Sequence, residues 1–372
     1  MLVSEVKSVR AGARKRRNPR AGIAAMLTVY SVGHFFVDMC CCASLIAFTK
    51  STNYFALSLV IYNFCAFALQ LPIGAIADRL QHHGGIAVFG CVAIAASMIA
   101  TPAPFVLSAV LGIGNACFHV GGGVFALRSD NTCAKLGIFV SPGAVGLFFG
   151  RLAADTYGFG GAPLMAIIIT VMLLCAASVM LTEPIADTYE KVAPFPHGLS
   201  VSYPLKNFMA CACFFLVVFL RSFGGLSFNF GWRDVTDATI AGAALALAAA
   251  FGKASGGIIS DKLGMRAASS ATLLCSAVLM IFSDSFIPAV MAVFFFNMTM
   301  PLTLRATADV CHGHEGFSFG LMTFSLFLGY MPAVYGIPLP FGIYGNVTVA
   351  VLSMAIMAAG LEMTSRRRGK NV

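Results

Sequence analysis

The chain has very little charge for its size. Only 10% of its 372 residues are Asp, Glu, Lys or Arg, whereas 59% are hydrophobic. A typical soluble domain carries about 25% charged residues. A soluble fold of this length would need a charged coat that this composition does not supply, so lipid is expected to be the solvent for most of the surface. The composition therefore predicts an integral membrane protein.

Metal-binding and catalytic patterns are also scarce. The 12 cysteines form no C-x-x-C pair and no paired metal spacing, and most lie within apolar stretches where Cys acts as a small hydrophobe. The run Gly121-Gly122-Gly123 is not a phosphate-binding loop, because no Lys and Ser or Thr follow it. We therefore predict no catalytic residue, no metal and no cofactor, and we do not expect an enzyme.

What the chain has in abundance is apolar stretches of about 20 residues, the length of a membrane-spanning helix. Twelve such stretches predict an all-α integral membrane fold with twelve transmembrane helices in two pseudo-symmetric halves of six. The predicted spans are 22–48, 54–77, 85–102, 104–127, 136–154, 161–182, 207–231, 236–260, 267–285, 287–305, 316–335 and 343–363.

The polar stretches between and around these spans suggest the division of the chain. The longest one separates the sixth span from the seventh and contains four prolines, which is typical of a linker. The expected parts are a basic tail (1–21), a first half (22–182), a linker (183–206), a second half (207–363) and a second basic tail (364–372).

Lys and Arg are distributed unevenly between the two expected faces of the membrane. Of the 24 such residues, only Lys50 and Arg233 fall in expected outer loops, and Arg151, Arg221 and Lys253 fall within spans. All the others lie on the side of the two termini. The positive-inside rule then predicts that both termini are cytoplasmic and that the membrane is the cell membrane. Basic clusters beside apolar spans favour anionic lipid, not nucleic acid, as the partner of the net charge of +9.

A short frame, G-x-x-x-D-[RK]-L, occurs at the end of both the second and the eighth span. The first copy starts at position 74 and the second at 257, an offset of 183. The Gly allows close helix approach, the Asp can cap the N-terminus of a neighbouring helix, and the cation can pair across the seam between the halves. Lys253 matches Gln70 of the first copy and is a further candidate for a cytoplasmic gate. The frame positions expected to act in gating are Gly74, Asp78, Arg79, Gly257, Asp261, Lys262 and Arg266.

These two copies in register resemble the signature loop of the major facilitator superfamily, which lies between helices two and three of each half. The resemblance covers essentially the whole chain. It implies a secondary transporter that works by alternating access, with spans one, four, seven and ten lining a central cavity. One chain holds both halves of the pathway, so a functional monomer is expected.

Two shorter segments resemble one branch of that superfamily more closely. Span one contains Gly33-His34-Phe35-Phe36-Val37-Asp38, and span four contains Gly112-Ile113-Gly114-Asn115-Ala116-Cys117-Phe118-His119. Both are similar to elements of the fosmidomycin-resistance-type transporters. Span five adds Ser141-Pro142-Gly143, a loose version of the antiporter motif. The finer resemblance implies export of a drug or metabolite by proton exchange.

Ionisable side chains within spans are the leading functional candidates, because burying one costs at least about 2.5 kcal/mol. His34 and Asp38 are four residues apart and share a helical face of span one. They are interpreted as a pair that takes and releases a proton, or as a static pair that satisfies itself. Asn115 and His119 have the same spacing in span four and are either site residues or packing residues.

Arg221 in span seven cannot release its proton and must therefore meet an anion. Its partner is expected to be Asp38 across the cavity or a carboxylate or phosphate of the solute, unless the side chain only extends toward the membrane surface. Asn229 in span seven and Asn297 in span ten are weaker candidates. Together with His119, Arg221 favours an anionic or zwitterionic solute.

Two features are expected to be structural. The Gly121–Gly123 run predicts a helix that bends or unwinds, and His82 and His83 are expected to be solvated loop residues.

Four functions remain open at this point. The leading hypothesis is a proton-coupled secondary transporter of a small solute, with export favoured. An uptake permease, a non-transporting sensor or scaffold of the same fold, and an intramembrane enzyme are the alternatives. The enzyme would need a nucleophile–base pair or a metal cluster on facing helices. His34, Asp38 and His119 are suitable metal ligands by type but include only one acidic residue.

Overall fold

The computed structural model describes residues 19–157, 162–186, 205–228, 230–234, 236–338 and 342–365. Within these ranges the regular secondary structure is helical, and no strand occurs, as the predicted all-α class requires. Most of the two predicted tails and of the predicted linker lies outside the described residues, and so does the candidate Asn229.

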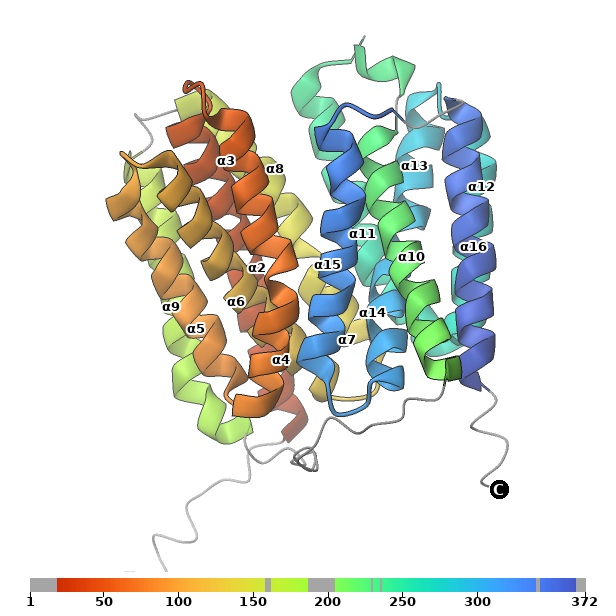
Figure 1. The fold of residues 1–372 in the computed structure, drawn as a ribbon, viewed down its shortest axis with the longest axis horizontal. Coiled ribbons are helices and arrows are strands. Elements are labelled where there is room, and N and C mark those ends of the chain that lie inside the picture. The colour runs from red at the N-terminus through yellow and green to blue at the C-terminus, as the bar shows by residue number, and fades with distance from the viewer. Residues whose placement is uncertain are drawn as a thin grey trace, which may run out of the picture.

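The described helices form two bundles that stand side by side in Figure 1. The first bundle contains α2 (Pro19–Thr49), α3 (Phe55–Asn63), η1 (Phe64–Ala68), α4 (Gln70–Leu80), α5 (His83–Ala96), η2 (Ser97–Ala100), α6 (Pro104–Arg128), α7 (Cys133–Val140), α8 (Pro142–Tyr157) and α9 (Ala162–Ala186). The second contains α10 (Leu205–Ser227), η4 (Gly231–Asp234), α11 (Ala238–Leu263), α12 (Met265–Ile281), α13 (Phe286–Asn297), α14 (Thr299–Val310), α15 (Glu315–Val334) and α16 (Ile343–Ser365).

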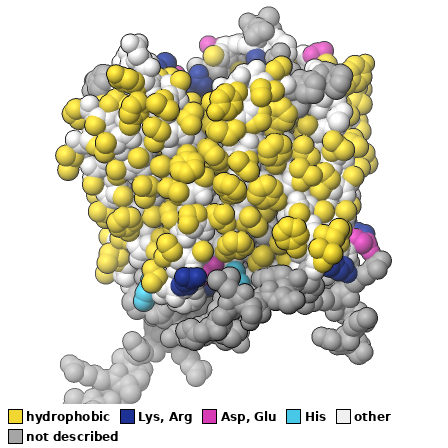
Figure 2. All heavy atoms as spheres, in the orientation of Figure 1, with side chains coloured by type: hydrophobic (Ala, Val, Ile, Leu, Met, Phe, Trp, Pro, Cys, Tyr) yellow, Lys and Arg dark blue, Asp and Glu magenta, His cyan; other side chains and the backbone are white. Residues whose placement is uncertain are grey.

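Eleven helices within the described residues are long and apolar enough to cross a membrane. Some of them are composite: α3, η1 and α4 make one span, and so do the pairs α7 with α8 and α13 with α14. A shorter apolar helix, Met265–Ile281, stands where the ninth span is predicted. In Figure 2 hydrophobic side chains cover the middle of the molecule, and charged side chains gather toward its two ends, as a bilayer-spanning protein requires.

Helix α6 lies in the middle of the first bundle, and most of its residues are buried. A Cβ on Gly114 would lie 2.7 Å from the carbonyl oxygen of Gly90 in α5, so these helices approach too closely for any side chain there. The Gly121–Gly123 run continues α6 without a break, and the predicted unwinding is wrong. Side chains at Gly121, Gly122 and Gly123 would overlap neighbouring helices, which shows that the run serves close packing.

Candidate functional site

The carboxylate of Asp38 lies where α2 meets α6, buried with three polar side chains around it. The Nε2 atom of His34 is 3.2 Å from Asp38 Oδ2, and the Nε2 atom of His119 is 3.7 Å from Asp38 Oδ1. Asn115 donates from Nδ2 to Asp38 Oδ1 at 2.8 Å. Each of the four residues is less than a tenth exposed. The structure thus brings four sequence candidates from two spans into one cluster, which we call the Asp38 cluster.

A hydrogen bond at Nδ1 of each ring fixes the orientation of His34 and His119 relative to the Asp38 carboxylate. His34 Nδ1 is 2.7 Å from the Phe139 carbonyl oxygen, and His119 Nδ1 is 2.9 Å from the Asn115 carbonyl oxygen. A carbonyl oxygen only accepts, so both Nδ1 atoms carry hydrogen and donate. Each Nε2 therefore meets the carboxylate either as a lone pair or as an N–H. A proton placed at this contact converts repulsion between lone pairs into a charge-assisted hydrogen bond.

Gly143, near the start of α8, closes the cluster on one side. A side chain there would overlap both His34 Nε2 and Asp38 Oδ2, so only glycine leaves the pair intact. Ser141, two residues before Gly143, donates from Oγ to the Ala250 carbonyl oxygen of the second half at 2.8 Å. Sequence reasoning noted this Ser-Pro-Gly segment only as a motif, because its contact with His34 is long-range.

The Asp38 cluster also has the residue types that a metal ion accepts. One ligand atom each from His34, Asp38 and His119 lie within 4.8 Å of one another. Each histidine also donates its other ring nitrogen to a carbonyl, as metal-ligating histidines do. The donor set of the Asp38 cluster is therefore compatible with a metal ion as well as with a proton.

Two basic side chains of the second half, Arg221 and Lys253, lie within spans. Arg221 in α10 is 8% exposed, and its nearest recorded polar partner is Thr303 Oγ1 in α14, at 3.5 Å. Lys253 in α11 is half-buried. Among the described residues, no carboxylate oxygen lies within 4.0 Å of either cation. The expected direct pair between Arg221 and Asp38 is therefore not formed.

The remaining polar candidates lie apart from the cluster. Asn297 donates from Nδ2 to the Val293 carbonyl oxygen of its own helix at 2.9 Å. Arg151 is exposed and 3.6 Å from Asp155, at the surface as expected for a side chain that reaches out of its span.

At the lower end of the molecule in Figure 1, each half caps a helix of the other half. Asp78, at the end of α4, accepts hydrogen bonds from the backbone nitrogens of Gly316 and Phe317 in α15, at 2.9 and 2.8 Å. We call this the Asp78 cap. A negative carboxylate at a helix N-terminus satisfies free N–H groups and interacts favourably with the helix dipole.

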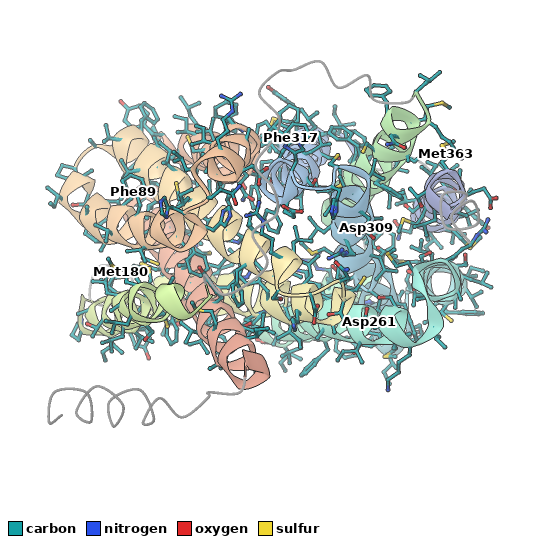
Figure 3. All side chains as sticks on the ribbon, turned by 90° about the horizontal axis from the view of Figure 1, so that it is seen from below. Phe89, Met180, Asp261, Asp309, Phe317 and Met363 are labelled. Carbon is teal, nitrogen blue, oxygen red and sulfur yellow. The ribbon has the colours of Figure 1, made fainter. Side chains whose placement is uncertain are left out.

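The second copy of the frame makes the same contact in the opposite direction. Asp261, at the end of α11, accepts from the backbone nitrogens of Cys133 and Ala134 in α7, at 2.8 and 2.9 Å. We call this the Asp261 cap. Figure 3, seen from this end, shows Asp261 and Phe317 at two separate places along the seam between the halves. The helices press closely at both caps, since side chains at Gly74 or Gly257 would overlap the backbone of Gly316 or Cys133.

The cations that hold the seam are not those of the frame. Arg79 and Lys262 are exposed and form no ion pair within the described part of the chain. Arg266 pairs with Glu362 of its own half. Their predicted pairing across the seam is therefore not seen.

Instead, Arg128 at the end of α6 reaches across the seam from the first half. Its Nε donates to Glu315 Oε2 at 3.0 Å, and its Nη2 is 3.5 Å from Asp78 Oδ1. Its Nη1 is 2.6 Å from His83 Nε2. His83 is half-buried, so its predicted place in a solvated loop is wrong, whereas His82 is exposed.

Arg305 makes the corresponding crossing from the second half. It donates from Nη1 to the carbonyl oxygens of Leu127 and Asp130, both at 3.1 Å, and from Nη2 to Asn131 Oδ1 at 2.9 Å. Burial opposes ionisation of Asp130, but hydrogen bonds from Lys135 and Thr132 outweigh it and lower the pKa of that carboxyl. The basic residues at the ends of spans 4 and 10 were the only sequence signal for these two contacts.

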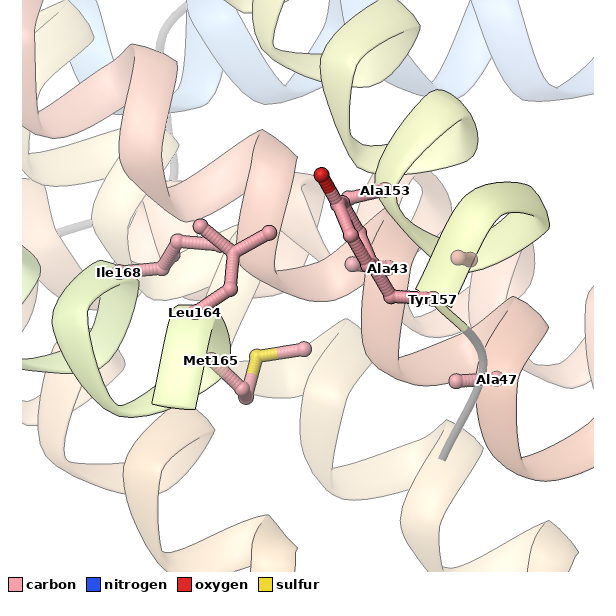
Figure 4. Close-up of a pocket in the computed structure, with 8 residues that line it drawn as sticks. Ala43, Ala47, Ala153, Tyr157, Leu164, Met165 and Ile168 are labelled. Atoms are coloured by element: carbon pink, nitrogen blue, oxygen red, sulfur yellow. The ribbon is translucent and has the colours of Figure 1, made fainter. Parts of the chain in front are cut away.

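A small pocket lies within the first bundle, between α2, α8 and α9 (Figure 4). Its volume is about 20 Å³, room for about one water molecule. Alanines, Tyr157, Leu164, Met165 and Ile168 line it. It contains none of the candidate residues and is too small for a solute.

Comparison with known proteins gives the fold. No family model matches the chain, and no curated protein sequence matches it significantly. Among solved structures, the E. coli fucose:proton symporter FucP, as a variant, matches with TM-score 0.65 and 11% identity over 92% of this chain and 99% of that one. A major facilitator transporter, FucP, in the outward conformation gives 0.62 and 13% over 93% and 98%.

A third structure, a bacterial homologue of the iron transporter ferroportin in its outward-facing state, matches with TM-score 0.59 and 14% identity over 92% of this chain and 100% of that one. All three are membrane transporters and none is an enzyme. The chain is a multi-pass membrane protein with the major facilitator fold. These neighbours do not distinguish the fosmidomycin-resistance-type branch from others.

Proposed function

We propose that this protein is a secondary transporter that moves a small solute across the cytoplasmic membrane by alternating access, coupled to protons. Both termini are cytoplasmic in this proposal, and export of a drug or metabolite is the favoured direction. The chain acts as a monomer, with the two bundles rocking about a central site. The observation that carries the proposal is the Asp38 cluster, in which two histidine Nε2 atoms converge on one buried carboxylate.

The geometry of the cluster supports a proton-binding role. Without a proton, the Asp38 carboxylate faces two nitrogen lone pairs, held there by the hydrogen bonds from His34 and His119 to carbonyl oxygens. With a proton, one of these contacts becomes a strong hydrogen bond. A change in water access as the bundles rock alters the cost of the charged carboxylate. Proton uptake on one side and release on the other follow from that change.

The two caps support the alternation. Asp78 and Asp261 join the halves at the end that carries the basic residues, so the state described here is closed toward the cytoplasm if the termini lie there. Opening to that side requires both caps to break. The proposed cycle therefore exchanges one set of contacts between the halves for another while the Asp38 cluster stays near the middle.

The test is a comparison of wild type with Asp38→Asn in a bacterium stripped of its major efflux pumps. Susceptibility is measured against antibiotics that include fosmidomycin and other small anionic compounds, and membrane insertion is checked for each variant. Protection by wild type and its loss in Asp38→Asn is expected. Asp155→Asn, which removes an exposed carboxylate bound to Lys50 at 2.5 Å, is the matched control and should protect normally.

Reconstituted protein separates coupling from transport. Asp38→Asn should lose accumulation driven by a pH gradient but keep exchange of solute down its own gradient. Normal gradient-driven accumulation by Asp38→Asn would contradict the coupling role.

Uptake is the second candidate function, because one structural neighbour is a fucose:proton symporter. Import predicts growth on a solute that the host cannot otherwise take up, with no protection against any antibiotic. A nutrient screen of the same strain distinguishes the two directions.

A further inference from the structure

The Asp38 cluster contains a close group of three metal-ligand side chains. One ligand atom each from His34, Asp38 and His119 lie within 4.8 Å of one another, and the centroids of the two imidazole rings are 4.3 Å apart. The described part of the chain holds no second group of three histidine, cysteine or acidic side chains this close together. Two imidazole nitrogens and one carboxylate are the protein donors of many sites that hold Zn²⁺ or Fe²⁺.

The spacing of the ligand atoms suits one shared ion. Two ligand atoms about 2.1 Å from the same ion are about 3.0 Å apart at right angles and about 3.4 Å apart at tetrahedral angles. His34 Nε2 is 3.2 Å from Asp38 Oδ2, and His119 Nε2 is 3.7 Å from Asp38 Oδ1. The second distance is too long for a hydrogen bond. It is close to the distance between two ligands of one ion.

Outer hydrogen bonds orient each of the three ligands. His34 donates from Nδ1 to the Phe139 carbonyl oxygen, and His119 donates from Nδ1 to a carbonyl oxygen of its own helix. Each neutral ring therefore presents the lone pair of Nε2 on the side of Asp38. Asn115 donates to Asp38 Oδ1 at 2.8 Å. Metal-ligating histidines and carboxylates have such outer hydrogen bonds, so the donors are in position before an ion arrives.

Gly143 keeps one side of the His34–Asp38 contact clear of any side chain. A Cβ at this position would overlap both His34 Nε2 and Asp38 Oδ2. All three ligands are less than a tenth exposed, so water compensates little for lone pairs that face one another. A cation placed among these lone pairs replaces their repulsion by attraction.

We propose that His34 Nε2, His119 Nε2 and the Asp38 carboxylate together bind one divalent first-row transition-metal ion, of the class of Zn²⁺, Co²⁺ and Fe²⁺. Imidazole nitrogens suit this class better than Mg²⁺ and Ca²⁺, which take oxygen ligands, and the group contains no thiolate for Cu⁺. With three protein ligands the ion keeps at least one position for water or another small ligand. The sequence predicted no metal because ligands on two separate helices form no metal spacing along the chain.

This metal site goes beyond the proposed function, and binding of the ion requires no transport. The metal ion and the proposed proton exclude each other, because both use the Nε2 lone pairs of His34 and His119. A bound ion should therefore block the proposed proton binding, and this consequence alone rests on the proposed function.

X-ray absorption of Zn²⁺ bound to the wild-type protein tests the site without any variant. The protein is purified in detergent without a polyhistidine tag, stripped with a chelator and given Zn²⁺ below stoichiometry. The spectrum should show nitrogen and oxygen ligands at about 2.0–2.2 Å, with outer scattering from two imidazole rings. Sulfur ligands at about 2.3 Å, or no uptake of Zn²⁺, would overturn the proposal.

Variants assign the ion to the three ligands, with Co²⁺ as the probe and its visible absorption as the readout. His34→Gln, His119→Gln and Asp38→Asn should each raise the Kd for Co²⁺ by more than the roughly tenfold that loss of an outer-shell partner costs. His82→Gln removes an exposed histidine outside the cluster and should bind Co²⁺ as wild type does. Equal affinity of wild type and His119→Gln, or displacement of Co²⁺ by a modest excess of Mg²⁺, would contradict the assignment.

Gly143→Ala tests the geometry while all three ligands are kept. Its methyl group overlaps two ligand atoms, so Co²⁺ binding should be lost. Gly85→Ala, where nothing lies within 4 Å, is the matched control and should bind normally. The melting temperature without metal shows that each variant is folded. Wild-type affinity in Gly143→Ala would mean that the ion binds elsewhere.

Failure of the metal site and failure of the proposed function give different results. A metal ion bound at the cluster of a protein that moves no solute refutes the proposed function alone. Proton-coupled transport by a protein that binds neither Zn²⁺ nor Co²⁺ refutes the metal site alone.

Discussion

The two caps at the seam have the same backbone arrangement and different side-chain support. In each, an Asp of the signature frame accepts hydrogen bonds from two consecutive backbone nitrogens of the opposite half. The Asp78 side chain is only 3% exposed and lies 3.5 Å from Arg128, which also binds Glu315. Asp261 is exposed. Arg305, the other cation that crosses the seam, pairs with Asp309 at 2.6 Å and also donates to Asn131 and to the carbonyl oxygens of Leu127 and Asp130.

The difference indicates that the two caps contribute unequally to the stability of the closed state. Hydrogen bonds to a buried charge are stronger than those to an exposed one, because water competes less and the local dielectric constant is lower. The Asp78 cap should therefore contribute more to keeping the halves together at this end. The Asp261 cap should open first when the molecule changes state.

The largest expected effect on the separation of the two halves comes from adding a side chain to Gly74 or Gly257, the glycines of the two frame copies. Gly74→Ala places a methyl group on the Gly316 carbonyl, and Gly257→Ala places one on the Cys133 carbonyl with a lesser overlap. Both should push the halves apart at this end, Gly74→Ala more so. The distance between spin labels on α4 and α15, and on α7 and α11, reports the opening. Gly85→Ala, where nothing lies within 4 Å, should leave both distances unchanged.

Removing the charge of each cap tests the inequality directly. Asp78→Asn should weaken closure by about 2 kcal/mol, roughly 30-fold in the ratio of closed to open molecules. Asp261→Asn should weaken it by about 1 kcal/mol, the typical value of a helix cap. Hydrogen exchange of the amides of Gly316 and Phe317, and of Cys133 and Ala134, measures each cap separately.

A variant that carries both Asp78→Asn and Asp261→Asn tests whether the two caps are coupled. If the two caps act independently, their effects on closure should add. A larger effect of Asp261→Asn than of Asp78→Asn would show that burial of Asp78 does not strengthen its cap, and the proposed order of opening would be reversed.

The smallest expected effect is the pH dependence that Asp130 contributes on the Asp261 side. The pKa of Asp130 is lowered in the folded protein, chiefly by Lys135 against the opposing effect of burial. A lowered pKa means that the stabilisation is fully present above the unfolded pKa of about 3.9 and is lost as pH falls through the folded value. The protection of the Cys133 and Ala134 amides, taken relative to their intrinsic exchange rate at each pH, should therefore fall slightly in acid in wild type. Asp130→Asn should remove this pH dependence without altering the Asp78 cap.

Much of the fold could be predicted from the sequence because its determinants are local. The lengths of the apolar stretches predict the spans, and the ninth, predicted at 267–285, is found as Met265–Ile281. The frame predicted the capping carboxylates, since Asp78 and Asp261 sit at the ends of apolar helices. The spacing of His34 and Asp38 predicted a shared face, because four residues make about one helical turn.

The rest depends on contacts between distant segments. Nothing local shows that Asn115 reaches Asp38 or that Phe139 orients His34. The frame cations were expected at the seam, but successive residues on a helix point about 100° apart. If Asp78 faces the seam, the adjacent Arg79 therefore faces elsewhere. The side chains that cross the seam are instead those of Arg128, at the end of α6, and Arg305, within α14.

The exchange of caps between the halves also bears on how such a molecule could arise. Asp78 reaches residues 316 and 317, and Asp261 reaches residues 133 and 134, so each contact is repeated with donor and acceptor on swapped halves. This reciprocity is the mark of an isologous interface, in which two identical subunits bind through the same patch. A single six-helix unit paired with its own copy would already satisfy both helix ends. Fusion of two copies would then preserve an interface that existed before duplication, leaving Arg128, Glu315 and Arg305 as later differences between the two sides.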